Sequence, residues 1–312
     1  MEKKKILEVK NISKRIGKKQ ILKDISFYIN EGDILGFIGP NGAGKTTAIK
    51  LILGLQSITS GKIFINGHSI EKEFTKAIER VGSIVESPDS YMYLTGYENL
   101  KINARLYRSV TDERIDEVVH LVGLENRIND KVSKYSLGMR QRLGIAIALL
   151  HKPNLIVLDE PNNGLDPEAI RELRNLLKKL AREENIAIMI ASHNLSEIES
   201  LCTTISIISK GEIIETDEIE HIRSKDFEKY LFKLSEIEDF IKLRRLFEYV
   251  LKKQITLEER DKQSFYVHIN EEDVPALTYA LTKEKYLIYE ISKERTTLED
   301  AFIDRTGGHK ID

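Results

Sequence analysis

Residues 39–46 read Gly-Pro-Asn-Gly-Ala-Gly-Lys-Thr, and they join the apolar run Ile34–Ile38 to the helix-like segment Gly44–Leu53. A strand, a glycine-rich turn and a helix in this order match the pattern G-x-x-x-x-G-K-[ST] of phosphate-binding loops. The glycines let successive backbone N–H groups face phosphate oxygens, and the start of the helix favours an anion. Lys45 adds a full positive charge at the β- and γ-phosphates, and the Thr46 hydroxyl is placed to bind Mg²⁺. We expect the nucleotide to contact Gly39, Pro40, Asn41, Gly42, Ala43, Gly44, Lys45, Thr46 and Thr47.

Two carboxylates end a second apolar run further along the chain. Leu155–Leu158 is followed by Asp159 and Glu160. A parallel strand beside a phosphate loop would direct Asp159 to the metal ion, and Glu160 would lie near the γ-phosphate as the general base for a water molecule. An apolar strand that ends in two acids is common, so this prediction depends on the phosphate loop upstream.

The composition limits the class of protein. The chain has 312 residues with 48 Lys and Arg against 50 Asp and Glu, a net charge of −2, which argues against a dedicated nucleic-acid binder. A single cysteine, Cys202, excludes an internal disulfide framework. The longest stretch without Asp, Glu, Lys or Arg has 12 residues, Asn185–Ser196, whereas a membrane-spanning helix needs about 20. We therefore expect a soluble, cytoplasmic, globular protein without a signal peptide.

Apolar runs alternate with helix-like segments over the first two thirds of the chain, which is typical of an α/β core. The expected strands are Ile6–Ile12, Ile25–Ile29, Ile34–Ile38, Lys62–Asn66, Val81–Val85, Leu155–Leu158, Ile186–Ala191 and Ile205–Ser209. The expected helices are Gly44–Leu53, Tyr97–Leu106, Glu113–Val122, Met139–Leu150 and Pro167–Glu184. Residues 88–151 contain no convincing strand, so we expect a helical insertion there.

The pattern changes near Asp217, and residues 217–312 predict a small α+β appendage. The expected elements are strands Lys229–Leu234, Phe265–Ile269 and Tyr286–Ile291 and helices Glu236–Phe247, Glu272–Thr282 and Leu298–Arg305. No cluster in the appendage has the spacing of metal ligands or of a nucleophile with its base. We therefore predict no second active site in it.

Further segments follow the phosphate loop in a fixed order. Residues 135–142, Tyr-Ser-Leu-Gly-Met-Arg-Gln-Arg, come first, then Asp159 and Glu160, then Asn163–Pro167, and then Ser192 with His193 at the end of an expected strand. Together with the phosphate loop, this set over residues 6–216 resembles the ATP-binding subunits of ABC transporters. Residues 135–142, called the signature segment below, are similar to the family's LSGGQ sequence. The resemblance implies a P-loop NTPase core of the ABC type with a helical insertion at about 88–151, in an ATPase domain of residues 1–216.

The resemblance also implies a mechanism that needs two chains and uses ATP with Mg²⁺. In such proteins two ATPase subunits sandwich two ATP molecules, and the phosphate loop of one faces the signature segment of the other. Ser136 and the Gly138 N–H would then contact the γ-phosphate in trans. His193 would contact the γ-phosphate and maintain the geometry of the attacking water, and Asp166 would link the two sites.

The sequence departs from the usual family pattern in three places, at four positions. Ile16 stands where a tyrosine usually stacks on adenine, so we expect either a weaker affinity for adenine or help from a neighbouring residue. Glu86 replaces the usual glutamine after the strand Val81–Val85, and with Tyr97–Leu100 this resembles the subset that handles bacitracin and lantibiotic peptides. A carboxylate at position 86 can bind Mg²⁺, either directly or through water. Leu137 and Met139 replace a glycine and a glutamine in the signature segment.

The resemblance further implies a separate membrane permease, which would hold this chain at the inner face of the cell membrane. The aromatic and apolar segment Tyr91–Leu94 is a candidate for docking that permease, or it packs inside the helical insertion. The residues Thr297–Phe302 resemble a carboxy-terminal segment of exporter ATPases that handle drugs and peptides. We therefore expect an ATPase that powers export of a peptide antibiotic or drug.

Two other functions are compatible with a nucleotide-binding chain of this kind. A soluble ABC ATPase acting on ribosomes or DNA usually has two cassettes or a long coiled coil, and this chain has one phosphate loop and no heptad run. A regulatory nucleotide binder that does not hydrolyse ATP is disfavoured, because Lys45, Asp159, Glu160 and His193 are all present. We expect no nucleic-acid partner.

Overall fold

The computed structural model describes residues 3–86, 90–219, 221, 229–237 and 239–294. Two compact units divide after Ile219, and each is described by itself. Asp217, where the sequence pattern changes, lies within the last strand of the first unit. None of the helices in these ranges combines the length and the apolar character that a membrane span requires.

The first unit contains two sheets. The antiparallel sheet has the order β2-β1-β4-β5, and the larger sheet has the order β10-β9-β3-β8-β7-β6. Strands β9, β3, β8, β7 and β6 are parallel, and β10 pairs with β9 in the antiparallel sense. The strands are β1 (Lys5–Ile16), β2 (Lys19–Asn30), β3 (Ile34–Ile38), β4 (Ser60–Ile65), β5 (His68–Ser69), β6 (Val81–Ile84), β7 (Leu155–Asp159), β8 (Ala187–Ser192), β9 (Thr204–Ser209) and β10 (Glu212–Glu218).

The central strands are apolar on both faces because both faces are covered. Every residue of β3, β7 and β8 is buried, which is the pattern of a parallel sheet between two layers. The core on one side joins residues of β1, β2, β4 and α1 to those of the large sheet. The helices of this unit are α1 (Lys45–Ile52), α2 (Phe74–Ile78), α3 (Gly96–Ala104), α4 (Asp112–Leu121), α5 (Leu137–Leu149), α6 (Pro167–Glu183) and α7 (Leu195–Leu201), with the 3₁₀ turn η1 (Val132–Lys134).

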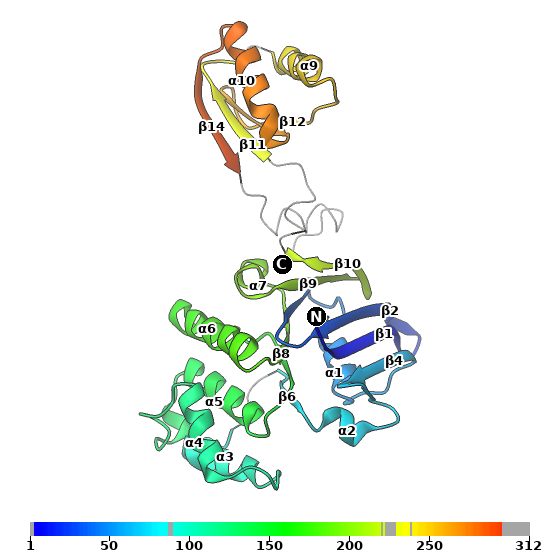
Figure 1. Cartoon of the computed structure of the whole chain (residues 1–312), viewed down its shortest axis with the longest axis vertical. Helices are drawn as coiled ribbons and strands as arrows, with labels where there is room; N and C mark the ends of the chain where they lie inside the picture. Colours follow the sequence, from blue (N-terminus) through cyan, green and yellow to red (C-terminus); the bar gives the residue numbers. More distant parts are fainter. Residues whose placement is uncertain (1–2, 87–89, 220, 222–228, 238, 295–312) are drawn as a thin grey trace. The chain divides into compact units, whose positions relative to one another are not determined.

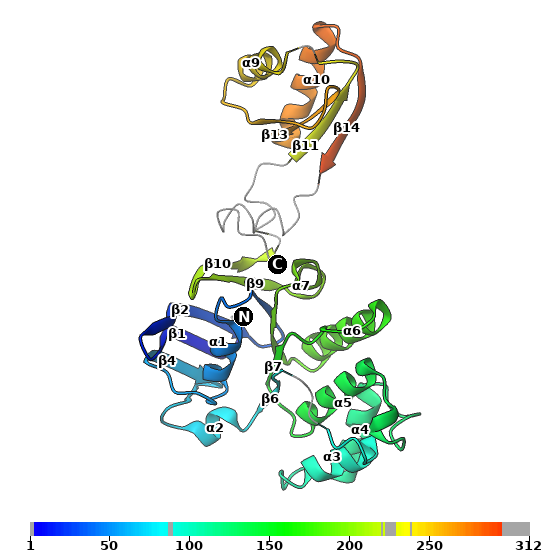
Figure 2. The ribbon, with the colours of Figure 1, turned by 180° about the vertical axis from the view of Figure 1, so that it is seen from behind.

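The helical insertion occupies one side of the first unit. In Figures 1 and 2, α3, α4 and α5 form a group on one side of the parallel strands, and β1, β2 and β4 lie on the other side. Within the described part of this region, residues 90–151, the structure has helices and one isolated bridge between Thr95 and Lys131. This agrees with the helical character expected from the sequence.

The second unit is an antiparallel sheet of order β12-β13-β11-β14 with two helices. Its elements are β11 (Lys229–Leu234), α9 (Phe240–Leu251), β12 (Leu257–Glu259), β13 (Ser264–His268), η2 (Glu271–Asp273), α10 (Val274–Lys283) and β14 (Ile288–Glu294). The order strand, helix, two strands, helix, strand is a split β-α-β arrangement. Its core is rich in phenylalanine, with Phe232 and Phe265 stacked at 5.5 Å and Phe247 beside them.

Some boundaries differ from those expected. The helix expected from Glu236 begins at Phe240, because the Asp239 carboxylate accepts hydrogen bonds from the N–H groups of Ile241 and Lys242 and caps the helix there. The strands β5, β10 and β12 and the helices α2 and α7 lie where the sequence pattern predicts no such element. The expected helix Leu298–Arg305 and the segment Thr297–Phe302 lie outside the described residues.

Candidate functional site

The phosphate loop connects β3 to α1, as its sequence requires. Gly42 and Gly44 have φ values of 79° and 110°, a region open to glycine at no steric cost. A Cβ on Gly44 would also lie 2.6 Å from Cδ2 of Leu22. The Lys45 side chain, only 6% exposed, donates a hydrogen bond to the Gly39 carbonyl at 2.8 Å. Burial lowers the pKa of the Lys45 ammonium, and the carboxylates of Glu160 and Asp159 oppose that shift.

The register of the parallel strands brings the candidate acids and the candidate histidine to the same edge of the sheet. Asp159 pairs with Ala191, and Ile38, just before the phosphate loop, pairs with Ser192. Because parallel strands end at one edge, the residues that follow β3, β7 and β8 become neighbours. His193 and Glu160 meet there, with Nδ1 of His193 2.9 Å from Oε2 of Glu160. Glu160 adopts a left-handed backbone conformation, with a φ of 47°.

Lys45 joins the same cluster from the phosphate loop. Its Nζ lies 3.7 Å from Oε1 of Glu160, so one carboxylate faces both a lysine and a histidine. Both members of the Lys45–Glu160 pair are largely buried, and their attraction is therefore screened less than that of a surface pair. These three residues come from positions 45, 160 and 193, and the structure places them together.

Asp159 has the features of a metal ligand. The residue is buried, and its Oδ1 has no hydrogen-bond partner within the part of the chain that the structure describes. Burial raises the pKa of Asp159, the Thr46 hydroxyl opposes the shift by hydrogen bonding, and Glu160 and Glu86 add to it. An unpaired buried carboxylate oxygen beside a hydroxyl is the type of donor set that Mg²⁺ accepts. The residues present therefore fit the ion.

Glu86 lies near this cluster but faces a different partner. It follows β6 with a φ of 70°, and its Oε1 accepts a hydrogen bond from Nζ of Lys50 at 3.0 Å. Lys50 was not singled out from the sequence, although it lies on α1 five residues after Lys45. Ile16 ends β1, and its side chain is 52% exposed.

The signature segment and Asp166 form a second group. Ser136 caps α5, its hydroxyl accepting from the Met139 N–H at 3.2 Å, and Asp166 caps α6, accepting from the Ala169 N–H at 2.8 Å. A Cβ on Gly138 would lie 2.9 Å from Cβ of Ala169, so α5 and α6 approach closely at this point. In both views α5 lies with α3, α4 and α6, whereas α1 lies beside the antiparallel sheet. Within one chain, the two groups therefore belong to different sides of the unit.

A hydrogen bond not foreseen from the sequence joins the loop after Glu160 to the helix after His193. The Asn162 amide donates to the Glu197 carboxylate on α7 at 2.6 Å. The two residues are 35 positions apart, and neither belongs to a recognisable motif. Only the pairing of β7 with β8 brings them together.

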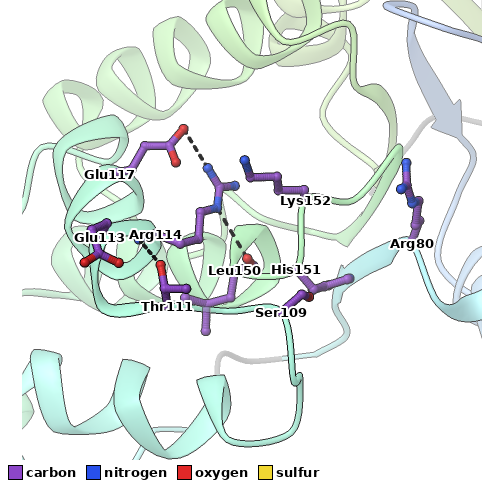
Figure 3. Close-up of a pocket in the computed structure, with 9 residues that line it drawn as sticks. All are labelled: Arg80, Ser109, Thr111, Glu113, Arg114, Glu117, Leu150, His151 and Lys152. Atoms are coloured by element: carbon purple, nitrogen blue, oxygen red, sulfur yellow. Dashed lines mark hydrogen bonds and ion pairs between the residues drawn. The ribbon is translucent and has the colours of Figure 1, made fainter.

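A pocket of about 480 Å³ lies elsewhere, at the opposite ends of β6 and β7 (Figure 3). Arg80 precedes β6 and Lys152 precedes β7, whereas Glu86 and Asp159 are at the carboxyl ends of these strands. Arg114 reaches from α4 to the carbonyls of Leu149 and Leu150. Because its polar groups serve as structural contacts and lie far along the strands from Lys45, this pocket is not the nucleotide site.

Comparison with known proteins identifies the family. Residues 22–163 match the family model of the ABC transporter. The chain is 44% identical over 307 residues to the ABC transporter ATP-binding protein YhcH of Bacillus subtilis (strain 168), covering 98% of both chains. The chain belongs to the ABC transporter ATP-binding proteins.

Two further matches extend this assignment. The bacitracin transport ATP-binding protein BcrA of Bacillus licheniformis is 46% identical over 232 residues, 74% of this chain and 76% of BcrA. A dimeric ATP-binding cassette solved in a post-hydrolysis state with ADP and Pi matches with a TM-score of 0.61 and 25% identity, over 69% of this chain and 99% of that one. The ABC-type P-loop fold predicted from the sequence is confirmed. The ABC ATPase binds and hydrolyses ATP as the energy-coupling subunit of a transporter, which confirms the transport function over the ribosome or DNA alternative.

Proposed function

We propose that this ABC ATPase powers the export of a peptide antibiotic through a separate membrane permease, as a pair of ATPase subunits at the inner face of the cell membrane. The similarity to BcrA, a bacitracin transport protein, supports the substrate class. The similarity to a dimeric cassette bound to ADP and Pi supports the paired state. The observation that carries the ATPase site is the Glu160 carboxylate between Lys45 and His193.

In this proposal the phosphate loop binds the triphosphate first. Its N–H groups and Lys45 hold the β- and γ-phosphates, and the γ-phosphate takes the place of Glu160 as the partner of Lys45. Thr46, Asp159 and Glu86 would hold Mg²⁺, with Asp159 Oδ1 as the preorganised acceptor. When bound, the ion neutralises charge on the phosphate oxygens.

Glu160 and His193 then act on the water and the γ-phosphate. Glu160 orients the attacking water and accepts its proton as general base. The 2.9 Å contact keeps the His193 ring beside that carboxylate, from where the ring reaches the γ-phosphate. The Asn162–Glu197 hydrogen bond keeps the loops that carry the two residues together.

The second subunit completes each site. Ser136 and Gly138 lie at the start of α5, where free N–H groups and the helix dipole suit an anion. Because this group lies apart from the chain's own phosphate loop, we assign it to the γ-phosphate held by the partner subunit. Asp166, at the start of α6 beside this group, would contact the facing subunit.

The segment Tyr91–Leu94 is the proposed docking surface for the permease. Tyr91 is 50% exposed, Tyr93 is 68% exposed, and their ring centroids lie 6.0 Å apart in an edge arrangement. Met92 is also exposed. Exposed aromatic side chains with a flexible methionine are suited to anchoring a helix.

The test is co-expression with the membrane permease that pairs with this chain. The double variant Tyr91→Ala/Tyr93→Ala should lose co-purification with that permease, and nucleotide affinity, which the phosphate loop determines, serves as the folding control. Cells expressing the pair should resist bacitracin, and the Lys45→Ala variant should not. Retained co-purification of the double variant would contradict the docking surface, and resistance without Lys45 would contradict ATP-driven export.

A further inference from the structure

Asn99 is a completely buried polar residue on α3, with 0% of its surface exposed. Its side chain makes three hydrogen bonds to backbone groups of the turn before the helix. The Oδ1 atom accepts from the Tyr91 N–H at 2.8 Å, and the Nδ2 atom donates to the carbonyls of Tyr91 at 3.1 Å and Thr95 at 2.8 Å. The amide thus pairs with both the N–H and the carbonyl of Tyr91, as a neighbouring strand would.

The other edge of the same segment is also held by hydrogen bonds. The Val132 N–H donates to the Leu94 carbonyl and the Ser133 N–H to the Met92 carbonyl, both at 2.9 Å. Residues 91–94 are therefore fixed between Asn99 on one side and the turn η1 on the other. Ser133 precedes Ser136 of the signature segment by three residues.

These contacts require an amide at position 99. A carboxylate can accept from Tyr91 but cannot donate to the two carbonyls, and an apolar side chain would in addition leave the Tyr91 N–H without its acceptor. The carbonyls of Tyr91 and Thr95 would each keep one backbone donor, the N–H groups of Leu94 and Asn99. A buried donor or acceptor without a partner destabilises the local structure. The start of α3 is separately stabilised, because Thr95 and Glu98 form a reciprocal capping box.

We propose that Asn99 is the positioning residue of the docking surface: its buried amide holds the Tyr91–Leu94 backbone in one conformation, so that both tyrosine rings are presented to the permease before it arrives. The proposal rests on the docking role of this segment. A preorganised segment loses little conformational entropy on binding, which increases affinity without any further contact. Asn99 itself contacts no partner.

The first experiment needs only the isolated subunit. Backbone amide hydrogen exchange is measured in the wild-type chain, in Asn99→Leu and Asn99→Asp, and in the matched control Asn103→Ala. Asn103 lies one turn further along α3, and its side-chain amide donates a hydrogen bond to the Asn99 carbonyl. Both Asn99 variants should exchange on the order of tenfold faster at residues 91–94, while Asn103→Ala should not. Unchanged exchange at these residues, or equal acceleration throughout α3, α4 and α5, would overturn the proposal.

The second experiment separates the positioning role from the docking surface itself. With the same permease, Asn99→Leu and Asn99→Asp should reduce co-purification while both tyrosines remain in place. If Tyr91→Ala/Tyr93→Ala reduces co-purification and neither Asn99 variant does, the positioning role is wrong and docking stands. If the tyrosine variant has no effect, the docking surface is wrong, and hydrogen exchange still decides whether Asn99 fixes the segment. Asn99→Asp, which keeps the shape and one hydrogen bond, covers the case in which Asn99→Leu does not fold.

Discussion

His193 and Glu160 face each other across 2.9 Å, although they follow different strands of the large sheet. The other oxygen of the same carboxylate lies 3.7 Å from the Lys45 ammonium. The carboxylate proposed as general base therefore contacts both groups that are proposed to meet the γ-phosphate. Arrival of the phosphate would release Glu160 toward water.

Replacing Glu160 with glutamine tests this arrangement. The amide has nearly the same shape and can still contact His193, but it cannot accept a proton, so hydrolysis should fall by about 10²- to 10⁴-fold while ATP still binds. Size-exclusion chromatography with ATP and Mg²⁺ should show a trapped dimer. The same substitution combined with Lys45→Ala serves as the control and should remain monomeric. A Glu160→Gln chain that stays monomeric with ATP would contradict the sandwich mechanism.

The acid stability of the first unit should depend on His151. Burial lowers the pKa of its imidazole from 6.5, the Val81 carbonyl opposes that shift, and Arg114 adds to it. The folded state disfavours the charged imidazole. The contribution of the neutral His151 ring to the free energy of unfolding is therefore complete above pH 6.5, and it is lost as pH falls through the lower pKa of the folded state.

His151→Phe should remove part of this acid sensitivity. The rings of His151 and Tyr107 stack nearly parallel, with their centroids 4.5 Å apart. Phenylalanine can keep this stacking, but it cannot be protonated. Thermal unfolding from pH 8 to pH 5 should therefore show a smaller decrease in Tm for the variant than for the wild type. His120→Phe, at a ring that is largely exposed, is the control and should follow the wild-type profile. Parallel profiles for wild type and His151→Phe would rule the effect out.

The adenine contact should improve with Ile16→Tyr. An aromatic ring stacked on the base contributes about 1 kcal/mol beyond its buried area, which corresponds to roughly fivefold tighter ATP binding. Position 16 ends β1 and is half exposed, so a larger side chain fits without repacking the core. Calorimetry measures the ATP affinity of the wild type and of Ile16→Tyr, with Ile16→Ala as the matched comparison. Equal affinity for the tyrosine variant and the wild type would remove position 16 from the adenine site.

Glu86→Gln should alter function rather than stability. The Glu86 side chain is 71% exposed, so its pair with Lys50 contributes at most about 1 kcal/mol to folding. We expect an unchanged Tm, but a change on the order of tenfold in the Mg²⁺ concentration for half-maximal ATPase activity, because a ligand of the ion is altered. Lys50→Met, which frees the carboxylate without removing it, should shift that concentration the other way. If Glu86→Gln leaves both ATPase rate and peptide resistance unchanged, the glutamate at position 86 has no functional effect relative to the glutamine usual in the family.

Much of the fold could be predicted because its periodicity is local. The runs Ile34–Ile38 and Lys229–Leu234 agree with the bounds of β3 and β11, since the first is apolar over its whole length and the second is mostly apolar. The strand β10 was missed because Glu212–Glu218 is mostly charged, and only its pairing with β9 makes it a strand. The α9 helix begins at Phe240, later than its sequence pattern predicts, because the Asp239 side chain caps it.

The site could be predicted where a motif fixes the backbone. The phosphate loop and the acids Asp159 and Glu160 at the end of β7 are predictable because each adjoins a strong apolar strand. Lys50, Asn162, Glu197 and Asn99 could not be found in this way. Lys50 lies 36 residues from its partner, Asn162 and Glu197 are 35 residues apart, and Asn99 lies 8 residues from Tyr91. The residue spacing within one segment does not predict such contacts.

The separation of Ser136 from Lys45 within one chain has a genetic consequence. In a pair of ATPase subunits, each composite site takes its lysine from one copy and its serine from the other. A cell that makes both a Lys45→Ala chain and a Ser136→Ala chain would therefore form mixed pairs in which one site carries both defects and the other carries neither. Two alleles that each fail alone should then partly restore resistance when expressed together.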